Sequence, residues 1–171
     1  EPQLSERRYA PAMNERTSLL RLTGRAAALL VLGASLASAA PAQVQVRDRF
    51  AIPVSDDGLP GAGPIRRYDW FQDLWRERRS AWAQQVGQDQ KAVVFLGDSI
   101  TQGWGGGLGA AFPGVKVANR GISGDTTRGV LLRLEEDVHA LHPAAVVLLI
   151  GTNDLEEGAL PEVVAGNLKL I

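Results

Sequence analysis

The chain has 171 residues, of which 45% are hydrophobic and 22% charged, and its formal net charge is −1. This composition is ordinary for a globular protein, and the balanced charge gives no electrostatic case for nucleic acid or an anionic membrane as the main partner. There is no cysteine and there are two histidines. Disulfides, thiolate catalysis and cysteine-ligated metals are therefore excluded, and a histidine-rich metal site is not expected.

Residues 1–42 have the pattern of a targeting segment. Met13, the only methionine, opens a stretch with three arginines, which is followed by an apolar segment at 26–40 and two Ala-x-Ala sites. This order describes a secretory signal peptide, and the apolar segment is shorter than the roughly 20 residues that span a membrane. We expect cleavage after Ala39 or Ala42, a secreted or periplasmic protein and no stable membrane anchor; an uncleaved anchor or a buried helix is the alternative.

The next boundaries follow from the same reasoning. Residues 1–12 precede the only methionine, and we expect them to be upstream sequence translated in error. Residues 43–65 are expected to form a linker, because proline, glycine and aspartate crowd together there and favour turns over packed elements. The remainder, residues 66–171, is expected to belong to one domain.

A helix is predicted from Tyr68 to about Val86, because Phe71, Trp75 and Trp82 recur at helical spacing on one face. We interpret this aromatic face as the side that docks on the core; a lid or a carbohydrate platform is the functional alternative. The charged residues of this region are expected to form its solvated face: Arg66, Arg67, Arg76, Glu77, Arg78 and Arg79.

The apolar run at 92–96 predicts a strand buried on both faces of a parallel sheet. Gly97 lets the backbone turn, so Ser99 falls just beyond the carboxyl end of the strand, where ligands bind in open α/β sheets. The glycine-rich stretch at 102–109 fits neither a dinucleotide-binding motif nor a P-loop. We expect a flexible loop near the site, in which Trp104 lines a pocket or caps the core.

Two further strands are expected, at 115–119 and 144–150. A helix follows the second strand to about Leu141, with its apolar residues on one face. Candidates for the cap of this helix are Ser123, Asp125 and Thr126. The third strand ends in the polar turn 151–154, and Pro161 occupies the first position of another helix.

This alternation predicts a flavodoxin-like, three-layer α/β/α fold with a parallel sheet in the order 2-1-3. Each strand ends in a polar turn that contains glycine. The first and third strands would flank the topological switch point, where ligands bind. Ser99 and Asn153 would then face each other across the crevice, with Gly124 arriving from the second strand.

These groups suit acyl transfer, which needs a nucleophile, a base and donors aimed at the oxyanion that forms. Ser99 offers a hydroxyl and its own N–H, and Gly124 offers an unobstructed N–H near a helix start. The side-chain amide of Asn153 offers a third donor. Together they would form an oxyanion hole around one serine.

Five other polar residues are expected to have no catalytic role. Asp98, Asp125 and Asp154 lie in the same turns and are expected to brace them. His139 and His142 precede the third strand and belong at the amino-terminal edge of the sheet, roughly 20 Å from the candidate serine at ~3.3 Å per residue. They are therefore expected to be surface histidines and not the general base.

Three segments resemble the first three sequence blocks of the GDSL, or SGNH, hydrolases. They are Gly97-Asp98-Ser99-Ile100, the stretch from Asn119 to Thr127 and Gly151-Thr152-Asn153-Asp154. The second is most similar to the branch of platelet-activating-factor acetylhydrolase catalytic subunits. The resemblance implies the SGNH hydrolase fold and a serine esterase for short-chain acyl or acetyl esters, without metal or other cofactor. It also implies that Ser99 is the nucleophile and that Gly124 and Asn153 complete the oxyanion hole.

The resemblance covers residues 92 to about 155. In the family, an Asp-x-x-His block near the carboxyl terminus supplies the base and its orienting carboxylate, and no such block occurs in these 171 residues. We therefore expect residues 66–171 to be the amino-terminal part of an SGNH domain, truncated after the third strand and inactive alone. The unpaired edge of the third strand is expected to make it prone to aggregation.

The expected partner is a small-molecule, carbohydrate or lipid ester substrate, with no role for nucleic acid. A non-catalytic carbohydrate-binding domain on the same fold is the alternative function. A flavodoxin-like binder of phosphate or nucleotides is a weaker alternative.

Overall fold

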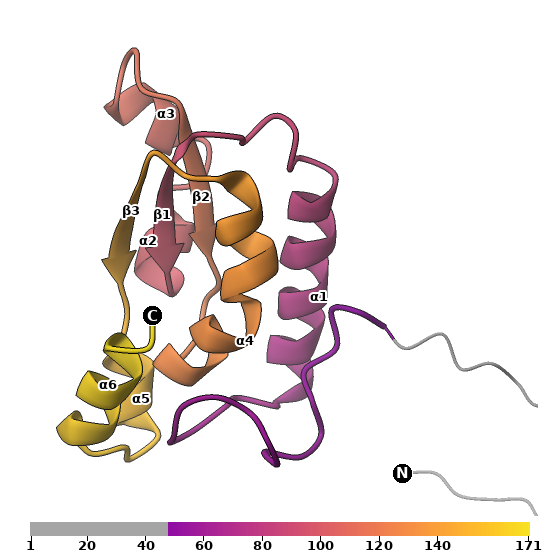
Figure 1. Ribbon diagram of the computed structural model, residues 1–171, viewed down its shortest axis with the longest axis vertical. Coiled ribbons are helices and arrows are strands. Elements are labelled where there is room, and N and C mark those ends of the chain that lie inside the picture. The colour runs from indigo at the N-terminus through magenta and orange to yellow at the C-terminus, as the bar shows by residue number, and fades with distance from the viewer. Residues whose placement is uncertain (1–47) are drawn as a thin grey trace, which may run out of the picture. The chain divides into compact units, whose positions relative to one another are not determined.

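The computed structural model describes residues 48–171, drawn in colour in Figure 1. The expected signal peptide, its cleavage sites at Ala39 and Ala42, and residues 1–12 lie outside the described residues. Across the described range, every helix is too short or too polar to traverse a lipid bilayer.

Three parallel strands form one sheet in the order β2-β1-β3. They are β1 (Val93–Gly97), β2 (Val117–Gly121) and β3 (Ala145–Leu149). Gly97 at the end of β1 is in register with Gly121 of β2 and with Leu149 of β3, so the carboxyl ends lie at one level. The predicted strand order is therefore confirmed, although β2 begins two residues later than expected.

The helices are α1 (Asp69–Ala83), α2 (Ser99–Gly103), α3 (Gly107–Ala111), α4 (Thr127–Asp137), α5 (Thr152–Glu156) and α6 (Pro161–Leu168), with a 3₁₀ turn η1 (His139–Leu141) after α4. In Figure 1, α4 lies alongside the sheet with α1 beyond it, and the strands point toward the end where α5 and α6 lie. The stretch at 102–109, expected to be a flexible loop, contains the end of α2, a turn at 104–106 and the start of α3, so the prediction holds only for the turn. The α/β three-layer fold itself is confirmed.

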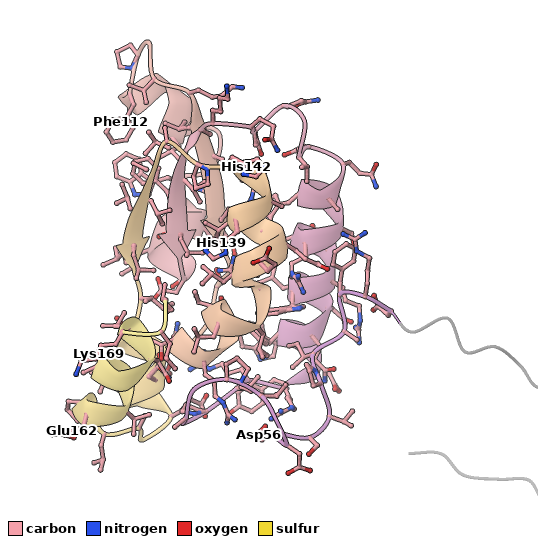
Figure 2. The ribbon with its side chains drawn as sticks, in the orientation of Figure 1. Asp56, Phe112, His139, His142, Glu162 and Lys169 are labelled. Atoms are coloured by element: carbon pink, nitrogen blue, oxygen red, sulfur yellow. The ribbon has the colours of Figure 1, made fainter. Side chains whose placement is uncertain are left out.

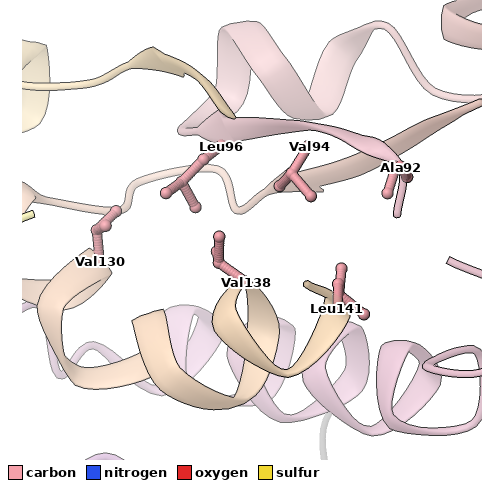
Figure 3. Close-up of a cluster of buried hydrophobic side chains, with 7 residues drawn as sticks. Ala92, Val94, Leu96, Val130, Val138 and Leu141 are labelled. Carbon is pink, nitrogen blue, oxygen red and sulfur yellow. The ribbon is translucent and has the colours of Figure 1, made fainter. Parts of the chain in front are cut away.

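The core between β1 and α4 is aliphatic (Figure 3). Val94 and Leu96 of β1 are fully buried against Val130, Val138 and Leu141. Each such side chain contributes about 1.5–3 kcal/mol when it leaves water. This contact fixes α4, and thereby the turn before it, against the central strand.

The second face of β1 is only half covered, so the prediction of a strand buried on both faces is wrong. Val93 and Phe95 are partly exposed. Phe95 packs on Phe112, with their ring centroids 5.1 Å apart.

The aromatic face of α1 docks on the core, as predicted. Phe71, Trp75 and Trp82 are buried in a second cluster with Ile122, which follows β2. The expectation of a solvated charged face is wrong for Arg79, which is buried and pairs with Asp137 of α4 at 3.0 Å. Its guanidinium carbon also lies 5.3 Å from the centroid of the Trp75 ring, so the charge meets both a carboxylate and an aromatic face.

Residues 48–65 contain no helix or strand but are anchored along their length. The Ala62 N–H donates to Asn167 Oδ1 at 3.0 Å, and Asn167 Nδ2 donates back to the Ala62 carbonyl at 2.8 Å. Arg128 of α4 donates to the Gly63 carbonyl at 2.9 Å. The turns predicted from composition are therefore held against the start of α4 and against α6.

The outer strand β3 is apolar and exposed. Among the described residues it pairs only with β1, and every one of its five residues is exposed. Its last four residues are 36–51% exposed, namely Val146, Val147, Leu148 and Leu149. The predicted unpaired edge of the third strand is thus present in the described part of the chain.

Candidate active site

Ser99 is the first residue of α2 and is exposed. The preceding Asp98 is buried and caps the helix, because its Oδ1 accepts a hydrogen bond from the Ile100 N–H at 3.0 Å. The cap fixes the backbone on both sides of the serine. Its hydroxyl is thereby presented at the carboxyl end of the central strand.

Gly97 and Gly121 allow the turns around Ser99 to approach each other closely. A Cβ at Gly97 would overlap the Leu149 carbonyl oxygen of β3 and the Thr101 hydroxyl. A Cβ at Gly121 would overlap the Gln102 N–H and would lie 2.8 Å from the Asp98 carbonyl oxygen. The start of α2 therefore sits directly against β1 and β2, and Gly97 lets β1 approach β3 closely.

Gly124 lies in the turn between β2 and α4 with φ +88°, a conformation that favours glycine. The turn is tied to α2, since the Ser123 N–H donates to Gln102 Oε1 at 2.7 Å. It is tied to β1 as well, since the Ile122 N–H donates to the Gly97 carbonyl at 3.0 Å. Thr126, one of three candidates from sequence, caps α4 through the Gly129 N–H.

A buried ion pair holds the same turn. Arg133 Nε lies 2.8 Å from Asp125 Oδ2, and both side chains are fully buried. Arg133 Nη2 also donates to the carbonyl oxygens of Arg120 at 3.0 Å and Gly97 at 3.3 Å. Burial raises the pKa of Asp125 to about 6, although the charge of Arg133 opposes that shift. One arginine thus joins the carboxyl ends of β1 and β2 to the Gly124 turn.

Asn153, in α5, is attached to this turn by its side chain. Its Nδ2 donates to the Asp125 carbonyl oxygen at 2.7 Å, which uses one of the two amide hydrogens and leaves the other free to donate. The next residue, Asp154, is buried and accepts a hydrogen bond from the Thr127 N–H at 2.9 Å. The structure therefore brings Asn153 and the Gly124 turn together.

The three candidate residues occupy one edge of the sheet. Ser99 follows the central strand, Gly124 follows β2 and Asn153 follows β3. Within residues 48–171, the backbone N–H groups of Ser99 and Gly124 donate to no other group. The expected bracing roles are confirmed for the three aspartates: Asp98 caps α2, Asp125 pairs with Arg133 and Asp154 joins α5 to α4.

His142 lies at the opposite edge of the sheet, as predicted, and His139 lies beside α4 (Figure 2). His139 is exposed and lies 3.0 Å from Glu135. His142 follows Leu141, whose carbonyl oxygen accepts from the Lys91 N–H just before β1 begins. Neither is placed to act on Ser99. Nor do three potential metal ligands of the His, Cys, Asp or Glu types come together within residues 48–171.

An aromatic pair, which was not predicted, lies beside Gly124. Tyr68 and Trp70 stack with an interplanar angle of 13° and centroids 6.3 Å apart, and we call them the aromatic platform. Arg66 lies next to them, and its Nε donates to Glu157 Oε1 at 2.7 Å. Its side chain is 9% exposed, so its expected place on a solvated face is wrong. Trp104 is half-exposed beside Phe112 and does not cap the core.

The fold and this edge define a class: three-layer α/β proteins that carry a serine, a glycine turn and an asparagine after three adjacent parallel strands. Residues 95–171 match the GDSL-like lipase/acylhydrolase family. This part of the chain belongs to that family.

Several characterised proteins are similar to the chain. An acetylxylan esterase of Geobacillus stearothermophilus is 37% identical over 94 residues, which cover 42% of this chain and 42% of that protein. The platelet-activating factor acetylhydrolase IB subunit alpha2 of Homo sapiens is 32% identical over 123 residues, 67% of this chain and 51% of that subunit. The alpha1 subunit of Bos taurus is 31% identical over 126 residues. The chain spans about half the length of these relatives, or less.

Proposed function

We propose that the chain carries the nucleophile and the oxyanion-binding groups of a serine esterase that cleaves short-chain acyl or acetyl esters. Ser99 Oγ would attack the ester carbonyl carbon as a base takes its proton, and the carbonyl electron pair would move onto oxygen. The resulting tetrahedral intermediate would collapse and expel the alcohol, which takes the proton back from the base. An acyl-enzyme on Ser99 would remain. Attack by water would then release the acid and restore Ser99.

One observation carries the proposal: Ser99, Gly124 and Asn153 follow three adjacent parallel strands, and their turns are bonded to one another. The N–H groups of Ser99 and Gly124 and the second amide hydrogen of Asn153 are the donors for the oxyanion. Because Arg133 and Asp154 hold these turns, little reorganisation would be needed as charge develops.

The general base forms part of the proposal. His142 lies at the far edge of the sheet and His139 pairs with Glu135 of α4, and the relatives extend over about twice the length that the chain covers. We propose that the base is the histidine of an Asp-x-x-His block outside residues 1–171, as the family resemblance implies, and that the 171-residue chain alone is nearly inactive. Stabilisation of the oxyanion alone would leave a residual rate about 10³-fold above that of the uncatalysed reaction in water.

The proposed setting is secretion or the periplasm, on the strength of the sequence pattern before residue 43, and no cofactor is invoked. The competing function is a non-catalytic carbohydrate-binding domain. The exposed aromatic platform beside the site favours it over other binding functions, because such faces suit sugar rings.

Hydrolysis of p-nitrophenyl acetate tests the esterase proposal. We would compare the 171-residue chain with a form extended through an Asp-x-x-His block. The extended form should turn over, Ser99→Ala should abolish its activity, and Asn153→Ala should lower kcat by ~10²–10³. Thr152→Ala, an exposed neighbour on α5, serves as the control and should retain activity. Equal activity of the two lengths would place the base within residues 1–171, and an active Ser99→Ala would refute the nucleophile.

A further inference from the structure

Three side chains from the start of α1 and the residues before it enclose Gly124. A Cβ built on Gly124 would lie 2.7 Å from Trp70 Cη2, 3.1 Å from Arg66 Nη1 and 3.3 Å from Phe71 Cδ2. Phe71 is buried in the core, whereas Trp70 is 52% exposed. The aromatic platform therefore borders the turn that supplies a proposed oxyanion donor, and it is open to solvent.

Polar groups edge the platform. The Tyr68 hydroxyl lies 3.3 Å from both carboxylate oxygens of Glu157. Arg66 pairs through Nε with Glu157 and through Nη2 with Glu156, and within residues 48–171 its Nη1 has no hydrogen-bond partner. Two nearly parallel rings thus stand next to a carboxylate that can accept hydrogen bonds and a guanidinium nitrogen that can donate them.

We propose that the aromatic platform binds a pyranose ring of the substrate's alcohol portion, with Arg66 and Glu157 contacting its hydroxyls. The C–H faces of a sugar ring are apolar and flat, so they match a half-exposed aromatic face, while the hydroxyls around the ring need charged or amide partners. A long acyl chain would instead require an enclosed apolar channel to leave water. The assignment of this ring to the alcohol of the ester rests on the proposed function, but binding of the ring does not.

Binding of xylotriose, an uncharged pyranose oligomer, to the 171-residue chain tests the proposal without turnover. In a ¹⁵N-labelled sample, the indole N–H of Trp70 should shift saturably as the sugar is added. Trp104 is the matched internal control, since it is 49% exposed and contacts Phe112 away from the platform; its indole signal should not shift. Trp70→Ala should weaken binding about 5- to 150-fold, by analogy with bases stacked on aromatic side chains. Trp70→Phe should retain most of it, and Trp104→Ala all of it.

Several results would overturn the proposal. One is the absence of a saturable shift at Trp70 in the wild-type chain, a measurement that needs no variant to fold. Another is unchanged affinity in folded Trp70→Ala, and a third is a shift at Trp70 with a short-chain phosphatidylcholine but none with xylotriose. Failure of the proposed function gives a different result. If the 171-residue chain bound the sugar but the form extended through an Asp-x-x-His block hydrolysed no ester, the platform would be supported and the esterase refuted. Hydrolysis without sugar binding would do the reverse.

Discussion

The two outer strands of the sheet support the site in different ways. The turn after β2 is held by a buried network, in which Arg133 contacts Asp125 and two strand-end carbonyls. On the other side, α5 is fastened by Asn153 and Asp154, yet β3 itself is exposed along its whole length. The hydrogen bonds that hold these turns are formed within residues 48–171, although Arg133 Nη1 is buried without a hydrogen-bond partner there, whereas the apolar face of β3 is left uncovered. Site geometry and sheet closure are separate properties in this molecule.

The largest effect should come from the β2 side. Arg133→Leu removes the partner of a buried carboxylate and two further donors, so we expect the free energy of unfolding to fall by about 3–5 kcal/mol. Urea denaturation of the 171-residue chain measures it. Arg76→Leu is the control, because Arg76 is paired with Asp48 and Asp73 at an exposed position and should cost less than about 1 kcal/mol. Equal losses would show that the buried network is no more important than surface pairs.

The second effect is a pH dependence specific to Asp125, whose pKa burial raises from 3.8 to about 6. A carboxyl group with a raised folded-state pKa stabilises the fold below pH 4, and this contribution is lost as pH rises through 6. The stability of wild type relative to Asp125→Asn should therefore fall by about 3 kcal/mol between these limits. Urea denaturation of both proteins across pH 4–7 tests it, since other groups cancel in the difference. A relative stability that increases with pH would mean that Arg133 outweighs burial.

A smaller effect is expected at the helix that carries Ser99. Asp98→Ala removes the cap of α2 and should cost about 1 kcal/mol of unfolding free energy, within a usual range of 0.5–2. Asp98→Asn keeps a capping oxygen and should lose only a few tenths of a kcal/mol of unfolding free energy. Comparing the two variants therefore separates the effect of capping from that of side-chain burial. If both variants lost the same stability by thermal denaturation, the carboxylate would act through its charge instead.

The sequence was sufficient for the features that depend on local pattern. Apolar runs followed by glycine placed Ser99, Gly124 and Asn153 at the carboxyl edge, and turn chemistry indicated that Asp98, Asp125 and Asp154 brace it. Arg133 was missed, although a single charge one turn beyond Val130 on an apolar helix face is a usable signal of a buried ion pair. Arg66, Tyr68 and Trp70 could not be placed, because their position beside Gly124 depends on how α1 docks across the core. Trp70 and Phe71 are adjacent in the sequence, yet Phe71 is buried and Trp70 is half-exposed. Which of the two faces the core depends on how α1 docks.

The smallest effect on stability, and the clearest on association, is expected at β3. Val147 is 45% exposed on a strand whose outer edge is unpaired among the described residues, so its backbone can pair with another chain. Val147→Lys places a charge on that edge and should raise the protein concentration at which light scattering detects association. It should cost less than about 1 kcal/mol of unfolding free energy. Val115→Lys is a matched control, since Val115 is 46% exposed but lies outside the strands, and it should leave association unchanged. If both lysines suppressed association equally, general charge repulsion would explain it, and the exposed edge of β3 would not be the surface through which chains meet.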